Sequence, residues 1–325
     1  MRAPSPAPFG LRDYGAAIGI VLIWGLNFVA MKLALRDFTP MQLGAARYVF
    51  AFLPLALLVR PPRMPPKWLA LYGLCQGVGQ FGLLFLALQV GMTAALASVL
   101  VQTQVFFTAL LGFLFLREHV GRPLQLGLVL AAVGLGCFAA NYLAPGAGAT
   151  QATTPLGFLL SLGAAAMWAV SNIVVRKAQR ATPEFNVLGF MVWTSMVPVL
   201  PFMLLSWVFD APQARWRWLH AAPSSWAAVA ALGWVATILA YTLWTGLLKR
   251  HAASRVAPFS LGVPLVGLAA GTLLLGETVS GWQWAGIVLL AGALGIVLLG
   301  PRWQGSFKTR IGSAERELEQ GKETL

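Results

Sequence analysis

Long apolar runs separated by short polar segments fill most of the chain. A helix that crosses the roughly 30 Å hydrocarbon layer of a bilayer needs about 20 apolar residues, and these runs are close to that length. Strands of a membrane β-barrel would instead show segments of about 10 residues with alternating polarity. The pattern therefore predicts an all-α polytopic membrane protein with ten transmembrane helices, near residues 14–33, 41–59, 68–90, 94–116, 122–142, 155–175, 185–208, 224–248, 253–275 and 281–300.

The composition supports the lipid bilayer as solvent and partner. Of the 325 residues, 58% are hydrophobic and 10% are charged, whereas a soluble domain carries about 25% charged residues. The ten acidic residues and three histidines fall in loops, at the ends of runs or in the C-terminal tail. Because no predicted span offers a deep carboxylate for a proton relay or a cation site, we expect neither a metal nor a cofactor.

The net charge of +13 at first suggests nucleic acid, but membrane topology explains it better. If both termini are cytoplasmic, eighteen lysines and arginines lie at the inner ends of spans and four at the outer ends, with Arg47 inside a span. This bias is the positive-inside rule. The sequence therefore predicts a multi-pass protein of the bacterial inner membrane with both termini cytoplasmic, and no nucleic-acid partner.

The chain contains an internal repeat. Shifted by 159 positions, residues 112–136 match 271–295 at eleven of twenty-five positions, including Glu118 with Glu277. A shift of 144 pairs Trp24 with Trp168. Two halves of five spans each result, and because five is odd, the halves enter the membrane in opposite senses. Such inverted repeats suit alternating access to a site near the midplane, although a channel or an enzyme could share the symmetry.

The repeat divides the chain into four parts. The first five-helix repeat occupies residues 1–143. The uncharged segment "APGAGATQATTP" (144–155) contains the linker 144–154 and ends on the first residue of the second repeat, which occupies 155–303. Residues 304–325 form a polar tail, which we expect to be cytoplasmic and either disordered or a short helix.

Four stretches resemble a known family: "WGLNFVAMK" (24–32), "LLFLALQVGM" (83–92), "GMTAALASVLVQTQVFFTALLGFLFLRE" (91–118) and "ASRVAPFSLGVPLVGLAAGTLLLGE" (253–277). They are similar to the EamA-type branch of the drug/metabolite transporter superfamily, over residues 12 to about 303. The resemblance implies ten helices in two inverted five-helix repeats around a central cavity. Within the family, the likeness is greatest to bacterial inner-membrane exporters of cysteine and O-acetylserine, which implies a small amphiphilic substrate.

Polar and aromatic side chains inside the spans are the candidate substrate-binding residues. An unpaired polar group is costly in hydrocarbon, so it usually faces the bundle interior or a water-filled cavity. Trp24 with Asn27, and Trp168 with Asn172, share helical faces at corresponding depths of the two halves. The alternatives are hydrogen bonding between helices and aromatic packing. The full set is Trp24, Asn27, Gln80, Gln102, Trp168, Asn172, Thr237, Tyr241 and Trp244.

Charged residues and prolines add further candidates. Arg47 lies about 9 Å into its span, where it could reach the headgroups or pair with carbonyls or an anionic substrate group. Glu118 and Glu277 are symmetry mates at span ends, suited to anchoring a helix or forming a gate. Pro258 and Pro264 each remove a backbone donor from span nine, so we expect a helix break that lines the site; such kinks are also ordinary in membrane helices.

The glycine motif "GVGQFG" (77–82) fits a dinucleotide fingerprint, but it lies within an apolar helix rather than after a strand. Together with Gly73 it also forms a Gly73-x-x-x-Gly77 pair. The sequence therefore predicts close packing of two helices at these glycines.

These observations favour a secondary transporter that exports small amphiphilic metabolites, amino acids or their derivatives such as cysteine and O-acetylserine, by alternating access. A drug, nucleobase or other metabolite transporter of the same fold is one alternative. A membrane-embedded transferase is another, but it needs a nucleophile with a base or a metal cluster, and no span holds a His, Asp or Glu beside its hydroxyls. We therefore expect a small-molecule substrate and no enzymatic activity.

Overall fold

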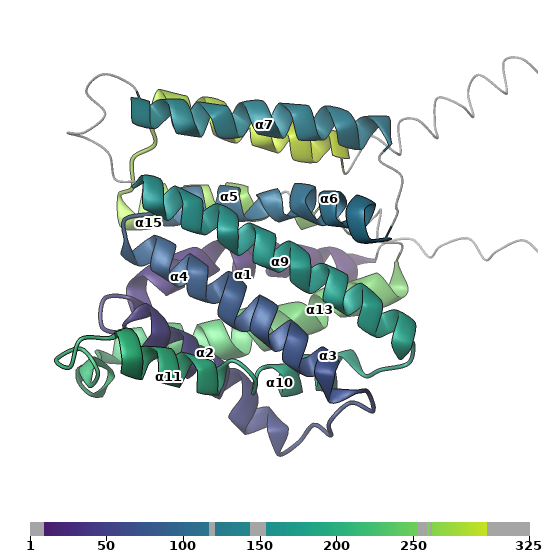
Figure 1. Cartoon of the computed structure of the whole chain (residues 1–325), viewed down its shortest axis with the longest axis vertical. Helices are drawn as coiled ribbons and strands as arrows, with labels where there is room; N and C mark the ends of the chain where they lie inside the picture. Colours follow the sequence, from purple (N-terminus) through teal and green to yellow (C-terminus); the bar gives the residue numbers. More distant parts are fainter. Residues whose placement is uncertain are drawn as a thin grey trace, which may run out of the picture.

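The computed structural model describes residues 10–116, 121–143, 154–251, 256, 259–260 and 262–297. All regular secondary structure among these residues is helical (Figure 1), which confirms the all-α prediction for the part of the chain that is described. A helical segment lies within each of the ten predicted runs.

The helices of the first half follow one another with short connections. Their bounds are α1 (Leu11–Ala34), α2 (Pro40–Ala56), α3 (Pro66–Tyr72), the π-helical segment η1 (Gly73–Phe81), α4 (Gly82–Gln89), α5 (Ala94–Leu100), the 3-10 turn η2 (Val101–Thr103), α6 (Gln104–Leu116) and α7 (Arg122–Leu143). Because α3, η1 and α4 are continuous, they form one span over Pro66–Gln89. In the same way α5, η2 and α6 form a single apolar segment.

The second half is also helical. Its elements are α9 (Pro155–Ala181), α10 (Val187–Thr194), α11 (Val199–Phe209), the 3-10 turn η3 (Arg217–His220), α12 (Pro223–Ala230), the π-helical segment η4 (Ala231–Leu239), α13 (Ala240–Arg250), α15 (Gly262–Leu275) and a helix over Gly281–Val297. Both π-helical segments are nine residues long, and each interrupts the third span of its half. Neither was predicted, because apolar patterning does not distinguish a π-helical segment from an α-helix.

Seven of these segments are long and apolar enough to cross a membrane, and Gly262–Leu275 and Gly281–Val297 are shorter apolar helices. The outward surface is correspondingly apolar. Along α11, for example, Leu200, Leu204 and Trp207 are all more than half exposed. A surface of this kind is stable against lipid tails and not against water, so the structure has the character of a multi-span membrane protein.

The helices pack in layers in which the two halves are interleaved (Figure 1). The helix over Gly281–Val297 lies beside α7 at one edge of the molecule, where Gly134 and Gly286 bring the two backbones together. In the interior α1 packs against α15, and α15 packs against α5. At the other side α2 packs against both α11 and η4. Elements of the first and second halves therefore share one core.

The clearest helix break among the described residues is in span seven. The α10 helix ends at Thr194 and α11 begins at Val199, with Pro198 between them. Proline has no backbone N–H to donate, and hydroxyls that bond to carbonyls of the preceding turn bend a helix. Here Ser195 Oγ donates to the carbonyl of Met191 at 2.8 Å.

The sequence also predicted a helix break in span nine, at Pro258 and Pro264. Pro258 lies outside the described residues. Pro264 occupies the first turn of α15, where proline is tolerated because the missing N–H would have no helical partner. Its carbonyl accepts a hydrogen bond from Ser98 Oγ at 3.4 Å, so this residue lies at a contact between α15 and α5.

Candidate functional site

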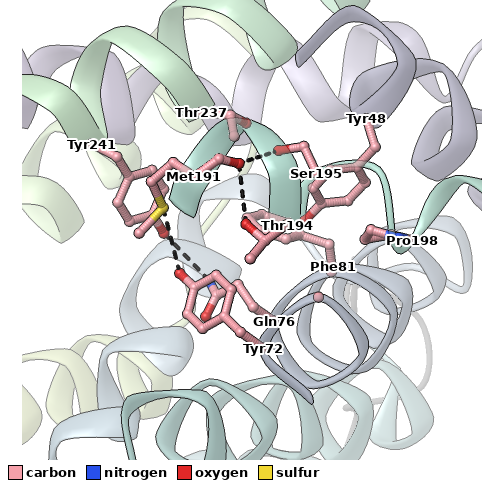
Figure 2. A pocket seen from close by; sticks show the side chains of 12 residues that line it. Tyr48, Tyr72, Gln76, Phe81, Met191, Thr194, Ser195, Pro198, Thr237 and Tyr241 are labelled. Atoms are coloured by element: carbon pink, nitrogen blue, oxygen red, sulfur yellow. Dashed lines mark hydrogen bonds between the residues drawn. The ribbon is translucent and has the colours of Figure 1, made fainter. Parts of the chain in front are cut away.

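A small pocket lies between four spans, two from each half (Figure 2). Its cavity volume is about 20 Å³, which has room for about one water molecule. An amino acid can therefore enter only if the surrounding spans move apart. The lining residues come from α2, from α3 and η1, from α10 and the turn that follows it, and from η4 and α13: Tyr48, Tyr72, Gly73, Gln76, Gly77, Phe81, Met191, Thr194, Ser195, Pro198, Thr237 and Tyr241.

Two glycines of η1 make one wall of the pocket possible. A Cβ atom on Gly73 would lie 2.9 Å from the carbonyl oxygen of Thr194, and one on Gly77 would overlap the ring of Pro198. Span three therefore contacts the break in span seven almost backbone to backbone. This confirms the prediction that the Gly73-x-x-x-Gly77 pair serves close helix packing.

Gln76 is the polar centre of the pocket. Figure 2 shows Tyr72, Gln76 and Tyr241 pointing toward one another. The Nε2 atom of Gln76 donates to Tyr241 Oη at 3.3 Å and to Gln80 Oε1, while its Oε1 accepts from Ser171 Oγ. Gln80, which the sequence singled out, thus holds Gln76 and is not itself among the lining residues.

Arg47 contacts two residues of the pocket wall, Thr237 and Phe81, and is itself 1% exposed. Its Nε and Nη2 atoms donate to Thr237 Oγ1 at 3.2 and 3.0 Å, and the guanidinium lies 3.8 Å from the centre of the Phe81 ring. Nη1 is buried and has no hydrogen-bond partner. Of the alternatives that the sequence left open, the structure excludes a side chain that reaches the headgroups.

Thr237 is suited to hold this guanidinium because of the π-helical winding of η4. Its hydroxyl donates to the carbonyl of Leu232, five residues earlier, at 2.8 Å. A hydroxyl has one donor and two acceptor sites, so both oxygen lone pairs remain for the two Arg47 nitrogens. The donor and both acceptor sites of the Thr237 hydroxyl therefore have partners within the protein, whereas Nη1 of Arg47 has none.

Three predicted aromatic residues meet beside the pocket. The Trp24 ring lies 5.1 Å from that of Tyr241 and 5.5 Å from that of Trp244, and Trp24 Nε1 donates to the carbonyl of Ala236 in η4 at 3.1 Å. The structure thus brings Trp24, Tyr241 and Trp244 together. Only Tyr241 lines the pocket, so the other two support it from the side of α1 and α13.

The two predicted asparagines are not brought together. Asn172 Nδ2 donates to Gln104 Oε1 at 2.9 Å and to Thr108 Oγ1 at 3.1 Å, which links α9 to α6. Among the described residues, the hydrogen-bond partner of Asn27 Nδ2 is the sulfur of Met31, at 4.0 Å, and Asn27 Oδ1 is buried without a partner. Neither lines the pocket, and Asn172 fits the alternative of hydrogen bonding between helices.

The remaining predicted polar residues have structural partners. Gln102 Nε2 donates to the carbonyl of Ser260 at 3.0 Å. For Trp168 the hydrogen bond involves the backbone and not the ring: its carbonyl accepts from Ser171 Oγ at 2.7 Å, and this hydroxyl also contacts Gln76. Gln102 therefore ties span four to span nine, while Trp168 lies one contact away from the pocket.

None of the residues that span seven contributes to the pocket wall was among the candidates from the sequence. Met191, Thr194, Ser195 and Pro198 all line the pocket, but none is charged and their run reads as an ordinary apolar span. A usable signal was the serine three residues before a proline at mid-span, since both residue types mark an interrupted membrane helix. Tyr48 was missed although it is adjacent to Arg47.

Glu277 anchors a helix of the opposite half. Its two carboxylate oxygens accept hydrogen bonds from the backbone amides of Ala94 and Ala95, each at 2.8 Å. These amides begin α5 and have no partner within the helix, and the helix dipole favours negative charge there. Glu277 thus acts as an inter-half anchor, and its symmetry mate Glu118 lies outside the described residues.

Comparison with known proteins agrees with this architecture. The model of the EamA-like transporter family matches residues 13–139 and again 155–299. A protein of Salmonella typhimurium named "Probable amino-acid metabolite efflux pump" is 37% identical over 90% of this chain and 96% of its own length. The Escherichia coli protein of the same name is 35% identical over 91% of this chain and 98% of its own.

A solved crystal structure shares the fold with a TM-score of 0.58 at 17% identity, over 90% of this chain and 98% of its own. At that identity the similarity bears on the fold alone. The two family matches together cover most of the chain, one in each half. The chain therefore belongs to the EamA-like transporter family.

Proposed function

We propose that this protein exports small amphiphilic metabolites of amino acids, of the kind represented by cysteine and O-acetylserine, by alternating access. The observation that carries the proposal is the position of the pocket, between two spans of the first half and two of the second. Its walls combine an amide, hydroxyls and aromatic rings, which suits a zwitterion with a small side chain. The names of the two bacterial relatives support the same class of substrate.

The proposal includes ten transmembrane helices in two inverted five-helix repeats, residues 1–143 and 155–303, joined by the linker 144–154. The paired π-helical segments support it, because they begin at Gly73 and Ala231, a separation within one residue of the 159-position shift in the sequence. An odd number of spans per half inverts the second repeat, so rocking of one repeat against the other would expose the pocket to each side in turn.

The proposed location is the inner membrane of a bacterium, with both termini and the 304–325 tail on the cytoplasmic side. The eighteen-to-four division of basic residues supports this orientation. Single-cysteine labelling of the 144–154 linker in intact cells tests it: we expect labelling from outside, and labelling only after permeabilisation would reverse the orientation.

Opening of the pocket requires spans that can bend without loss of their hydrogen bonds. The pocket is bordered by η1, by η4 and by the break at Ser195–Pro198. Each of these departs from regular α-helical hydrogen bonding, and such departures are frequent at functional sites. We infer that spans three, seven and eight bend at these points when substrate enters.

Counterflow in proteoliposomes tests the proposal. Vesicles loaded with unlabelled cysteine or O-acetylserine should accumulate the labelled compound transiently, while vesicles loaded with a nucleobase, a sugar or a lipophilic drug should not. A response to the drug or the nucleobase alone would favour the alternative transporters of the same fold. Chemical conversion of the substrate would instead favour a membrane-embedded transferase. No response to any compound by folded protein would overturn the proposal.

A further inference from the structure

Arg47 has an unusual environment for a cation inside a membrane protein. An uncompensated buried charge is costly, and intramembrane arginines are normally paired. Among the described residues no carboxylate lies within ion-pair distance of Arg47; its contacts are the hydroxyl of Thr237 and the face of the Phe81 ring. Neither partner carries a negative charge, so the protein itself leaves the charge uncompensated there.

The guanidinium is also held in a fixed orientation. Two of its nitrogens donate to Thr237 Oγ1, and its plane is covered by Phe81. Both of these residues line the pocket. Nη1 is the one Arg47 nitrogen without a partner. A small displacement of Phe81 or Thr237, such as opening of the pocket requires, would bring this donor to the cavity.

On the basis of the proposed function, we propose that Arg47 binds the α-carboxylate of the substrate and thereby selects amino acids over amines and neutral compounds of the same size. Guanidinium groups bind carboxylates with short, charge-assisted hydrogen bonds, and a buried donor left unsatisfied penalises any substrate that lacks the acceptor. The carboxylate also supplies the counter-charge that the surrounding residues lack. Arg47 is thus a specificity-determining residue, and Thr237 and Phe81 position it.

The experiment compares cysteine with cysteine amide, which has a similar shape but no carboxylate, as competitors of labelled cysteine counterflow. For the wild type we expect cysteine to compete roughly tenfold to a hundredfold more strongly than the amide, the range expected for one charge-assisted hydrogen bond. Arg47→Gln should weaken competition by cysteine by a similar factor and leave competition by the amide nearly unchanged. The acid-to-amide ratio should therefore fall towards one.

Two further variants keep the result interpretable. Arg47→Lys retains the charge but loses the planar fork, so it should retain the preference for the acid with weaker overall affinity. Lys32→Arg is the matched control, since Lys32 is another cation within the spans, lies outside the pocket lining and donates to the carbonyl of Leu88 at 3.3 Å. It should leave the ratio unchanged.

The outcomes separate this inference from the function on which it rests. Failure of folded wild-type protein to exchange any amino acid would overturn both. Exchange of cysteine without discrimination against the amide, or an unchanged ratio in Arg47→Gln, would overturn the role of Arg47 alone. If Arg47→Gln does not fold, the lysine variant decides: weaker competition by cysteine than in the wild type, with a preference for the acid still present, supports the proposal, and competition by cysteine as strong as in the wild type contradicts it.

Discussion

The Gly77→Ala substitution should destabilise the protein, because span three and the break in span seven have no space between them. The new methyl group would overlap the ring of Pro198, and the next atoms are also close, with Pro198 Cβ at 2.8 Å and Tyr48 Cζ at 3.4 Å. A proline ring cannot rotate away as a flexible side chain can. Insertion of one methyl group into a well-packed interior costs about 1–3 kcal/mol, so we expect a loss of stability in that range.

The assay is reversible unfolding in mixed micelles with increasing denaturing detergent, together with the counterflow rate. Gly136→Ala is the matched control, because no atom of the described residues beyond its own helical turn lies within 4 Å of its added Cβ, and alanine is the better helix former by up to about 1 kcal/mol. We expect lower stability and slower exchange for Gly77→Ala, and unchanged or slightly raised stability for the control. Equal stability of the two variants would refute the backbone-to-backbone contact that forms the pocket wall.

Three further predictions concern groups outside the pocket. Glu277→Gln removes the negative charge that faces the first amides of α5, so it should lower the free energy of unfolding by about 1–2 kcal/mol. Counterflow at fixed pH should remain, and a loss of pH-driven transport with intact counterflow would show a carboxylate relay instead. The Ser225 hydroxyl, followed by the backbone amide of Ala222 just before α12, lowers the pKa of Asp37. This contact should therefore stabilise the protein above the usual carboxyl pKa, and the stabilisation should be lost as the pH falls through the lowered value. Asp37→Asn should remove that acid-sensitive part of the thermal midpoint, and an unchanged pH profile would contradict it. Asn172→Leu should lower the thermal midpoint by breaking the bonds to α6. Asn27→Leu, which loses no strong hydrogen bond, should leave the midpoint nearly unchanged, and a larger loss for Asn27→Leu than for Asn172→Leu would contradict this assignment.

The positions of the helices could be predicted from the sequence because each apolar run must be long enough to cross hydrocarbon, and the length of a run can be counted directly in the sequence. The glycine pair Gly73 and Gly77 could be interpreted for a similar reason, since two glycines four residues apart on an apolar helix have few uses other than close packing. Both predictions depend on local properties of a single segment.

The site was only partly predictable, because it depends on which spans meet. Trp24 and Tyr241 were identified as polar–aromatic residues within spans, and the structure brings them together. Asn172 has the same appearance in the sequence, yet its amide is used by a neighbouring helix. Nothing within span six could indicate that Gln104 faces Asn172. The π-helical winding that directs Thr237 toward Arg47 is likewise invisible in an apolar pattern.

The central claim, that substrate binds between the two halves at this pocket, is tested most directly by substrate protection of a single cysteine. Ser195→Cys, in a background with Cys75→Ala and Cys137→Ala, places one thiol at the pocket wall. The control is the Cys75→Ala variant, which keeps only Cys137, in α7 at the edge of the molecule and outside the pocket.

The measured quantity is the rate of maleimide labelling in proteoliposomes as O-acetylserine is increased. The account predicts that labelling at position 195 slows, with half-protection at the concentration that half-saturates counterflow, while labelling of Cys137 does not change. Normal counterflow by the Ser195→Cys variant, with no protection of its thiol at saturating substrate, would contradict the account and place the binding site elsewhere.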